Sequence, residues 1–165
     1  QLYMLVSNTS TLVLLAKITA LEKFLQISPK ITIPIQVKDE YSFEKESYYA
    51  KLIDKLVVEK KIIIENVNEK NLVDVMQQFH MDKGEAAAYT LYKRGKYKAV
   101  LTDDGELIKL CKLEQIPFIC ALAVVVTLYE KKVLAKNETL GKMEKLKILG
   151  RYSKEIYEHF IKEVK

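Results

Sequence analysis

The sequence predicts an α/β domain in which a short, mostly parallel sheet is covered by helices on both faces. Short apolar stretches alternate along the chain with longer segments in which apolar residues recur every three or four positions. Strands that read as continuous apolar runs are typical of parallel sheets buried on both sides. The chain has 165 residues, 49% of them hydrophobic and 30% charged, which is enough for one buried core and too apolar for a disordered chain.

The expected strands are short apolar stretches, most of them rich in β-branched residues. They lie at Leu2–Val6, Ile31–Ile33, Lys61–Glu65, Ala99–Thr102 and Pro117–Cys120. Because the strands alternate with helices, their carboxyl ends should meet at one edge of the sheet, where α/β proteins bind ligands.

The segments between the strands carry helix signals, such as the spacing of Leu12, Leu15 and Ala16. Pro34 is expected at the first position of a helix, where its missing N–H is harmless. The expected helices lie around 12–16 and 21–25, from Pro34 through Tyr41, over Ser47–Val58 and Val67–Phe79, from Asp82, from Asp103 and Asp104 through Leu110, and over Ala121–Tyr129. Two more close the chain, the last with Ile156, Phe160 and Val164 at spacings of four.

Charge divides the chain into a core at residues 1–130 and a basic helical extension of the same domain at residues 131–165. The core carries 17 basic and 17 acidic residues, whereas the extension carries 10 basic and 5 acidic, which accounts for the net charge of +5. A basic extension is compatible with contacts to phosphates and equally with a solvated, Lys-rich helix surface.

Composition indicates the cellular compartment of the protein and the residue types that could form a metal site. Cys111 and Cys120 lack metal-type spacing and read as buried thiols in a reducing cytoplasm. The apolar run 116–129 contains a proline and is shorter than the ~20 residues of a membrane span, so we expect no membrane partner. His80 and His159 are too few for a His-rich site. Carboxylates must therefore hold any metal ion.

Polar residues follow the expected strands at positions that would share one edge of the sheet. Asn8 follows the first strand, Glu40 lies in the helix after the second, Glu85 starts a helix, and Asp103 and Asp104 follow the fourth expected strand. Converging carboxylates suit Mg²⁺ or Mn²⁺, which can polarise a phosphoryl oxygen and activate water.

Each of these residues also has a simpler explanation. Asp82-x-x-Glu85 and Asp103-x-x-Glu106 both fit helix-capping boxes. Asn8 or Ser10 fits an N-cap, and a glutamate in the middle of a helix can face water. Capping does not require all these residues to face one edge, so their shared location favours a site.

Four segments in order, 5–12, 33–40, 83–88 and 100–104, resemble the motifs of PIN-domain proteins. The likeness is to a prokaryotic branch close to the VapC-type toxin ribonucleases. It implies a three-layer α/β/α fold with extra C-terminal helices and a metal-dependent endoribonuclease activity, as in toxins of toxin–antitoxin pairs. The residues that it implicates are Glu40, Glu85 and Asp104 as metal-linked acids, Asp103 as a neighbour or alternate ligand, and Thr9 and Ser10 as residues that shape the site.

Asn8 departs from the PIN pattern, which has Asp at this position. Asn offers a neutral carbonyl oxygen and an amide donor, so affinity for a divalent cation should fall. The chain is then a weakened nuclease, a natural member without activity, or an engineered Asp→Asn form.

Two other classes of function compete with a nuclease. The first is an inactive PIN-like module that binds RNA or a protein. The second is a phosphotransfer domain, which is disfavoured because Asn8 cannot form an acyl phosphate. Expected partners are RNA, an antitoxin protein and a second copy of the chain, bound through the first helix with Leu12, Leu14 and Leu15, although these leucines equally fit a core.

Overall fold

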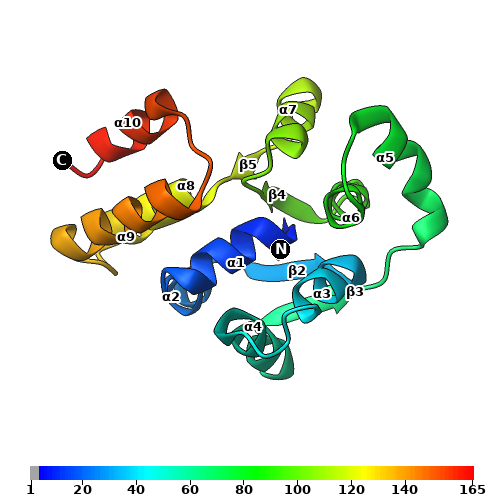
Figure 1. Ribbon diagram of the computed structural model, residues 1–165, viewed down its shortest axis with the longest axis horizontal. Helices are drawn as coiled ribbons and strands as arrows, with labels where there is room; N and C mark the ends of the chain where they lie inside the picture. Colours follow the sequence, from blue (N-terminus) through cyan, green and yellow to red (C-terminus); the bar gives the residue numbers. More distant parts are fainter. Residues whose placement is uncertain (1–3) are drawn as a thin grey trace.

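Five parallel strands form the centre of the structure, in the order β3-β2-β1-β4-β5 (Figure 1). The strands are β1 (Met4–Ser7), β2 (Lys30–Pro34), β3 (Ile62–Glu65), β4 (Tyr97–Leu101) and β5 (Phe118–Ile119). The computed structural model describes residues 4–165, so Leu2 and Tyr3 of the first expected strand lie outside the described residues. All five expected strands are present, with ends that differ by one to a few residues.

The chain runs outward from the central strand β1 first to one side and then to the other. It forms β2 and β3 on one side, then crosses to form β4 and β5 on the other side. The strand order therefore reverses beside β1, and parallel α/β sheets have their binding crevice at the carboxyl end of such a reversal. Asn8 and Asp103 flank this point, since they follow β1 and β4.

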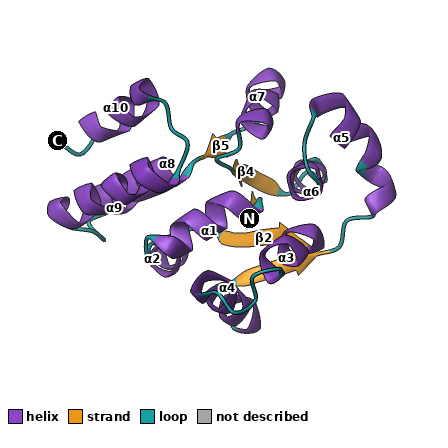
Figure 2. Cartoon of the chain, in the orientation of Figure 1, coloured by secondary structure: helices purple, strands orange, loops and turns teal. Residues whose placement is uncertain are grey.

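Helices cover both faces of the sheet (Figure 2). They are α1 (Thr9–Lys17), α2 (Leu21–Ile27), α3 (Ile35–Ser42), α4 (Tyr48–Val58), a 3₁₀ turn η1 (Glu69–Asn71), α5 (Val73–Phe79), α6 (Lys83–Tyr92), α7 (Gly105–Glu114), α8 (Ala121–Glu130), α9 (Lys136–Leu149) and α10 (Lys154–Lys162). Leu5 packs with the helices of one face and Val6 with those of the other, as alternation along a strand requires. The expected three-layer α/β/α fold is confirmed.

The basic extension is part of the main core. Leu134, Met143, Leu146 and Val164 are buried in the cluster that contains the interior of α1, α4 and α8. The segment 131–165, which carries the charge excess, thus also contributes apolar side chains to the fold.

Lys142 of α9 stabilises the end of α1. Its ammonium group donates to the Ile18 carbonyl and to Thr19 Oγ1, both at 2.8 Å. Ile18 is the C-cap of α1, so a buried lysine satisfies a carbonyl that the helix leaves without a partner.

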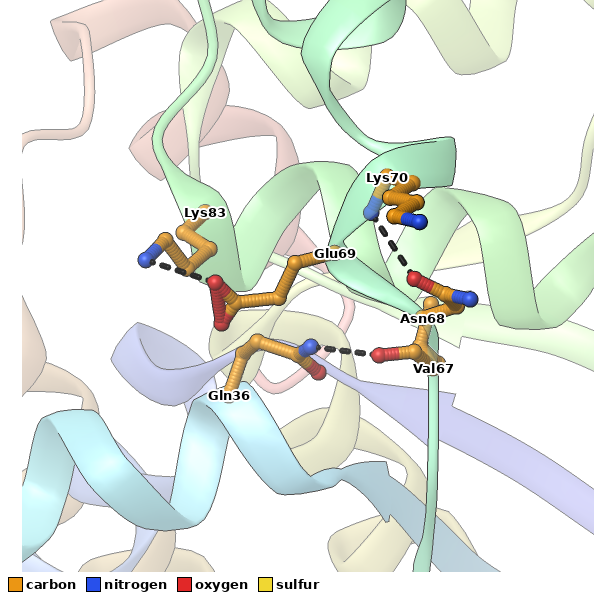
Figure 3. A network of polar contacts seen from close by, with 6 residues as sticks. All are labelled: Gln36, Val67, Asn68, Glu69, Lys70 and Lys83. Carbon is orange, nitrogen blue, oxygen red and sulfur yellow. Dashed lines mark hydrogen bonds and ion pairs between the residues drawn. The ribbon is translucent and has the colours of Figure 1, made fainter.

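The expected helix over Val67–Phe79 is wrong in its first part, as Figure 3 makes clear. Gln36 Nε2 donates to the Val67 carbonyl at 2.8 Å, and the Asn68 side chain accepts from the Lys70 amide at 3.0 Å. These two contacts hold 67–68 outside the helix and begin the short turn η1. Pro34 also differs by one position, because it ends β2 and is the N-cap of α3.

Two of the leucines expected at a dimer surface are core residues. Leu12 and Leu15 have no exposed surface, whereas Leu14 is partly buried. A homodimer contact through the first helix could therefore use only Leu14 of this set. Within residues 4–165, every helix is too short or too polar to cross a membrane.

Candidate active site

A cleft with a volume of about 1420 Å³ opens beside the carboxyl ends of β1 and β4. Residues of α1, of α7, of α10 and of the turn before α10 line it. Every residue that the sequence analysis selected lines this cleft. These residues are Asn8, Thr9, Ser10, Glu40, Glu85, Asp103 and Asp104. The fold thus brings together side chains that are up to 96 positions apart in the chain.

Glu40 projects from α3 to the start of α6. Its carboxylate accepts a hydrogen bond from Thr9 Oγ1 and one from the Gly84 amide. A Cβ atom at position 84 would overlap this carboxylate, so only glycine leaves the space that it occupies. Burial raises the pKa of Glu40, the Thr9 and Gly84 hydrogen bonds lower it, and nearby Asp82 raises it.

Glu85 belongs to the capping box that the sequence predicted at α6. The Glu85 amide donates to Asp82 Oδ1 at 2.8 Å, and the Asp82 amide donates to Glu85 Oε1 at 3.1 Å. Burial raises the pKa of Glu85 to about 9, assisted by the side chains of Asp104 and Asp82 within hydrogen-bonding reach. Carboxyl groups are therefore crowded at this helix start, and without a cation Glu85 keeps its proton at neutral pH.

The two adjacent aspartates have different partners, and the capping box expected from Asp103 is wrong. Asp104 is the N-cap of α7, where its Oδ2 accepts from the Leu107 amide at 2.8 Å. Asp103 instead accepts from Thr11 Oγ1 at 2.7 Å, from the Ala121 amide at 2.9 Å and from the Tyr152 hydroxyl. Asp103 thereby connects β4 to α1, α8 and the segment before α10.

Two opposing effects act on the pKa of Asp103, which is raised overall. Burial raises the pKa of Asp103, whereas the hydrogen bonds from Tyr152, Thr11 and Ala121 lower it. The same contact acts in the opposite direction on the tyrosine, because burial and the nearby carboxylate both raise the pKa of Tyr152. Tyr152 is thus a hydrogen-bond donor at neutral pH.

Asn8 is buried and is the N-cap of α1, as one of the two simpler explanations predicted. Its Oδ1 accepts from the Thr11 amide at 3.4 Å and from Ser10 Oγ at 3.3 Å. Its Nδ2 donates to Thr102 Oγ1 at 2.9 Å, and the same oxygen accepts from the Asp104 amide at 3.1 Å. The amide donor of Asn8 therefore helps to tie β1 to β4 below the carboxylates.

The donor set fits a hard divalent cation in its chemistry. Carboxylates of α3, α6 and the start of α7 offer oxygen ligands. A cation would favour the charged forms of Glu40 and Glu85, whose pKa values are raised first by burial and then by neighbouring acids. In residues 4–165, however, no three acidic, histidine or cysteine side chains are close enough together to hold an ion in their present rotamers. Glu85 and Asp104 would have to rotate away from the amides that they cap.

Three residues of the site escaped the sequence analysis. Gly84 stood inside a recognised motif, but its role depends on Glu40, which is 44 positions away. Arg151 and Tyr152 line the cleft from the turn between α9 and α10, and no local pattern connects that turn to the acidic residues. Only the folded arrangement of α8, α9 and α10 brings Arg151 and Tyr152 to the cleft.

Comparison with known proteins gives one finding on identity. No curated protein matches the chain at a significant level. Residues 4–165 match the model of the family DUF3368, whose description is PIN domain. The match includes every element of the sheet and both C-terminal helices. Because it spans nearly the whole sequence, the chain belongs to this PIN-domain family.

Proposed function

We propose that the protein is a divalent-metal-dependent endoribonuclease that hydrolyses phosphodiester bonds, with activity weakened by Asn8. The observation that carries the proposal is the single cleft lined by Glu40, Glu85 and Asp104 at the carboxyl edge of a PIN-domain sheet. The residues come from three different helices or helix starts, and capping alone gives no reason for them to share a cleft.

In the proposed reaction Glu40, Glu85 and Asp104 hold Mg²⁺ or Mn²⁺, with Asp103 as an alternate ligand. The ion supplies Lewis-acid polarisation of the scissile phosphate and lowers the pKa of the attacking water. Thr9 orients Glu40 through its hydroxyl group.

The asparagine at position 8 is the reason that we propose a weak activity. An aspartate there would add a charge beside Asp104 and Thr102, whereas Asn8 contributes only a carbonyl oxygen that already accepts two hydrogen bonds. The expected result is a lower affinity for the metal ion with the fold unchanged.

Cleavage of RNA with Mn²⁺ tests the proposal. Asn8→Asp should raise the apparent affinity for Mn²⁺ by about tenfold and increase cleavage at limiting metal. Glu40→Gln, which keeps the shape of the side chain and removes its charge, should lose cleavage in both backgrounds. Folded protein that cleaves no RNA, with either Asn8 or Asp at position 8, would remove the enzyme from consideration.

The second candidate is an inactive PIN-like module that binds RNA or a protein. It is favoured by the hydrogen bonds that occupy both polar atoms of the Asn8 side chain. A ligand that binds only the folded state raises the melting temperature. A Mn²⁺ titration that leaves the melting temperature unchanged, both for the chain and for Asn8→Asp, would favour the module.

The biological setting proposed with the nuclease is that of a cytoplasmic VapC-like toxin with RNA as substrate. An antitoxin protein and a second copy of the chain are the proposed protein partners. Support comes from the PIN-domain match and from the two buried cysteine thiols, which fit a reducing compartment.

A further inference from the structure

Two cleft-lining positive groups, one on α7 and one in the turn between α9 and α10, have no acidic partner within residues 4–165. Lys112 and Arg151 both line the cleft and are exposed. Among the contacts recorded for the described residues, neither side chain makes a hydrogen bond or an ion pair, although Glu155 of α10 and the carboxylates of the acidic site line the same cleft. Cations that stay unpaired beside so many carboxylates are available to an anionic ligand.

Arg151 lies in the α9–α10 corner, which we define as residues 150–153. The corner is held against the acidic side of the cleft because the Tyr152 hydroxyl donates to Asp103. Gly150 permits this, since a Cβ atom at that position would overlap the Tyr152 ring and crowd the Leu146 carbonyl. Arg151 is therefore fixed one residue away from a direct contact with the acidic site.

The residue type at position 151 also favours phosphate binding. Only two of the 27 basic residues are arginines, Arg94 and Arg151. Arg94 follows α6 and does not line the cleft, whereas Arg151 does. The planar guanidinium binds phosphate through two parallel N–H donors, which a lysine cannot reproduce.

Apolar and aromatic side chains continue the cleft beyond the carboxylates. Phe118 of β5 and Phe160 of α10 line it together with Arg151. Aromatic rings beside a cationic group are the combination that binds unpaired bases and their backbone.

We propose that Arg151 binds a backbone phosphate of the RNA strand next to the one that is cleaved, and that the α9–α10 corner is part of the substrate-binding surface. This inference rests on the proposed function. It assigns to the basic extension a specific contact with substrate in addition to its role in the core.

Binding of RNA without cleavage tests the assignment. The full-length chain is titrated, in EDTA, into a fluorescently labelled single-stranded RNA oligonucleotide, and anisotropy is followed at several salt concentrations. Arg151→Gln should weaken binding about five- to tenfold and lower the slope of log K against log salt by about 0.7, the value for one lost phosphate contact on a single strand.

Matched variants separate this contact from general charge. Arg94→Gln removes the same charge outside the cleft and should change affinity by less than about twofold. Arg151→Lys should restore the salt slope but only part of the affinity. Because Arg151 is exposed, the thermal melt of each variant should match that of the parent chain.

Two results would overturn the inference and can be told apart. If the parent chain binds RNA and Arg151→Gln behaves like Arg94→Gln, the assignment of Arg151 is wrong and the proposed nuclease stands. If the parent chain binds no RNA at any salt concentration, Arg151 has no such role, whereas cleavage of RNA with Mn²⁺ still decides the proposed function.

Discussion

Gly84 leaves the space in which the Glu40 carboxylate meets the start of α6. A methyl group at this position would displace the end of a flexible side chain, so the fold should tolerate Gly84→Ala. Alanine in a helix is worth about 0.5–1 kcal/mol over glycine. We expect an unchanged or higher melting temperature, together with a 10- to 100-fold loss of RNA cleavage, roughly the effect of misplacing a reactive group.

Gly141→Ala in α9 is the control for this prediction. A Cβ atom there would meet nothing within 4 Å, so the variant should keep both stability and activity. Thermal melts and cleavage assays on the two variants check the prediction. Gly84→Ala protein that cleaves RNA at the parent rate would show that the position of Glu40 does not matter.

The raised pKa of Glu85 predicts how stability depends on pH without metal. Its folded value of about 9 lies above the ordinary 4.5, so the folded state retains a proton that the unfolded chain loses between these values. The contribution to stability is full below pH 4.5 and is lost as pH rises through 9. In EDTA the chain should therefore become less stable from pH 5 to pH 9.

Glu85→Gln should reduce this loss, because glutamine keeps the capping box without the charge. Solvent screening at a half-exposed group limits the effect to about 1 kcal/mol, or about 2–4 °C in melting temperature. Thermal melts across the pH range measure it, with Glu106→Gln in the first turn of α7 as control. Parallel pH curves for Glu85→Gln and the parent would contradict the assignment of the raised pKa.

At the level of single residues, the sequence predicted which side chains share the cleft better than it predicted the contacts that they make there. The seven selected residues line the cleft because strand ends in a parallel sheet share an edge, which is a property of the strand pattern. Which aspartate caps α7 depends on a shift of one residue at the end of β4, which no local pattern determines. The role of Tyr152 depends on a contact with Asp103, 49 positions away, so no local sequence pattern predicted it.

Among the elements, the strands and most helices followed from apolar spacing and caps. Ser47 caps α4 and Asp82 caps α6 through local hydrogen bonds, so the sequence located both helix starts. The prediction of a helix over 67–72 was wrong because the conformation of this region depends on Gln36, a residue of another helix. Local signals predicted local structure, and the errors lie where a distant side chain decides.

The α9–α10 corner predicts a stability effect at the level of elements. Tyr152→Phe removes a hydrogen bond to the partly buried Asp103 carboxylate and should destabilise the fold by about 1.5–3 kcal/mol. The melting temperature should fall by about 3–12 °C. Protection of α10 amides from hydrogen exchange should decrease as well, because the corner loses its contact with the acidic site.

Tyr157→Phe is the matched control in α10. Its hydroxyl makes only a 3.5 Å contact with Glu144 at the surface, so its loss should change the melting temperature little. Equal effects of the two variants would show that the Tyr152–Asp103 contact does not hold the corner in place.

For the whole molecule, the charge boundary at residue 130 is not a structural boundary. Helix α8 packs against α1, α2 and α9, and the buried side chains of α8 and α9 belong to one cluster. The charged residues of α9 and α10 lie mainly on the solvent-facing side of these helices. Their apolar residues pack into the core on the other side, and we expect this packing to determine how the molecule unfolds.

The last prediction follows from this shared core. Leu146 of α9 is fully buried, so Leu146→Ala should destabilise the molecule by about 2–5 kcal/mol. Since α9 completes the core around α1 and α8, the loss should lower one cooperative transition for the whole chain. Leu113→Ala removes the same atoms from a side chain that is 75% exposed and should have little effect.

Circular dichroism, which reports all helices, and tyrosine fluorescence should give the same shifted midpoint for Leu146→Ala. Two separate transitions, with the sheet unfolding at the parent temperature, would mean that residues 131–165 unfold as an independent unit. The α9–α10 corner could not then hold Arg151 in the cleft as firmly as the binding proposal requires.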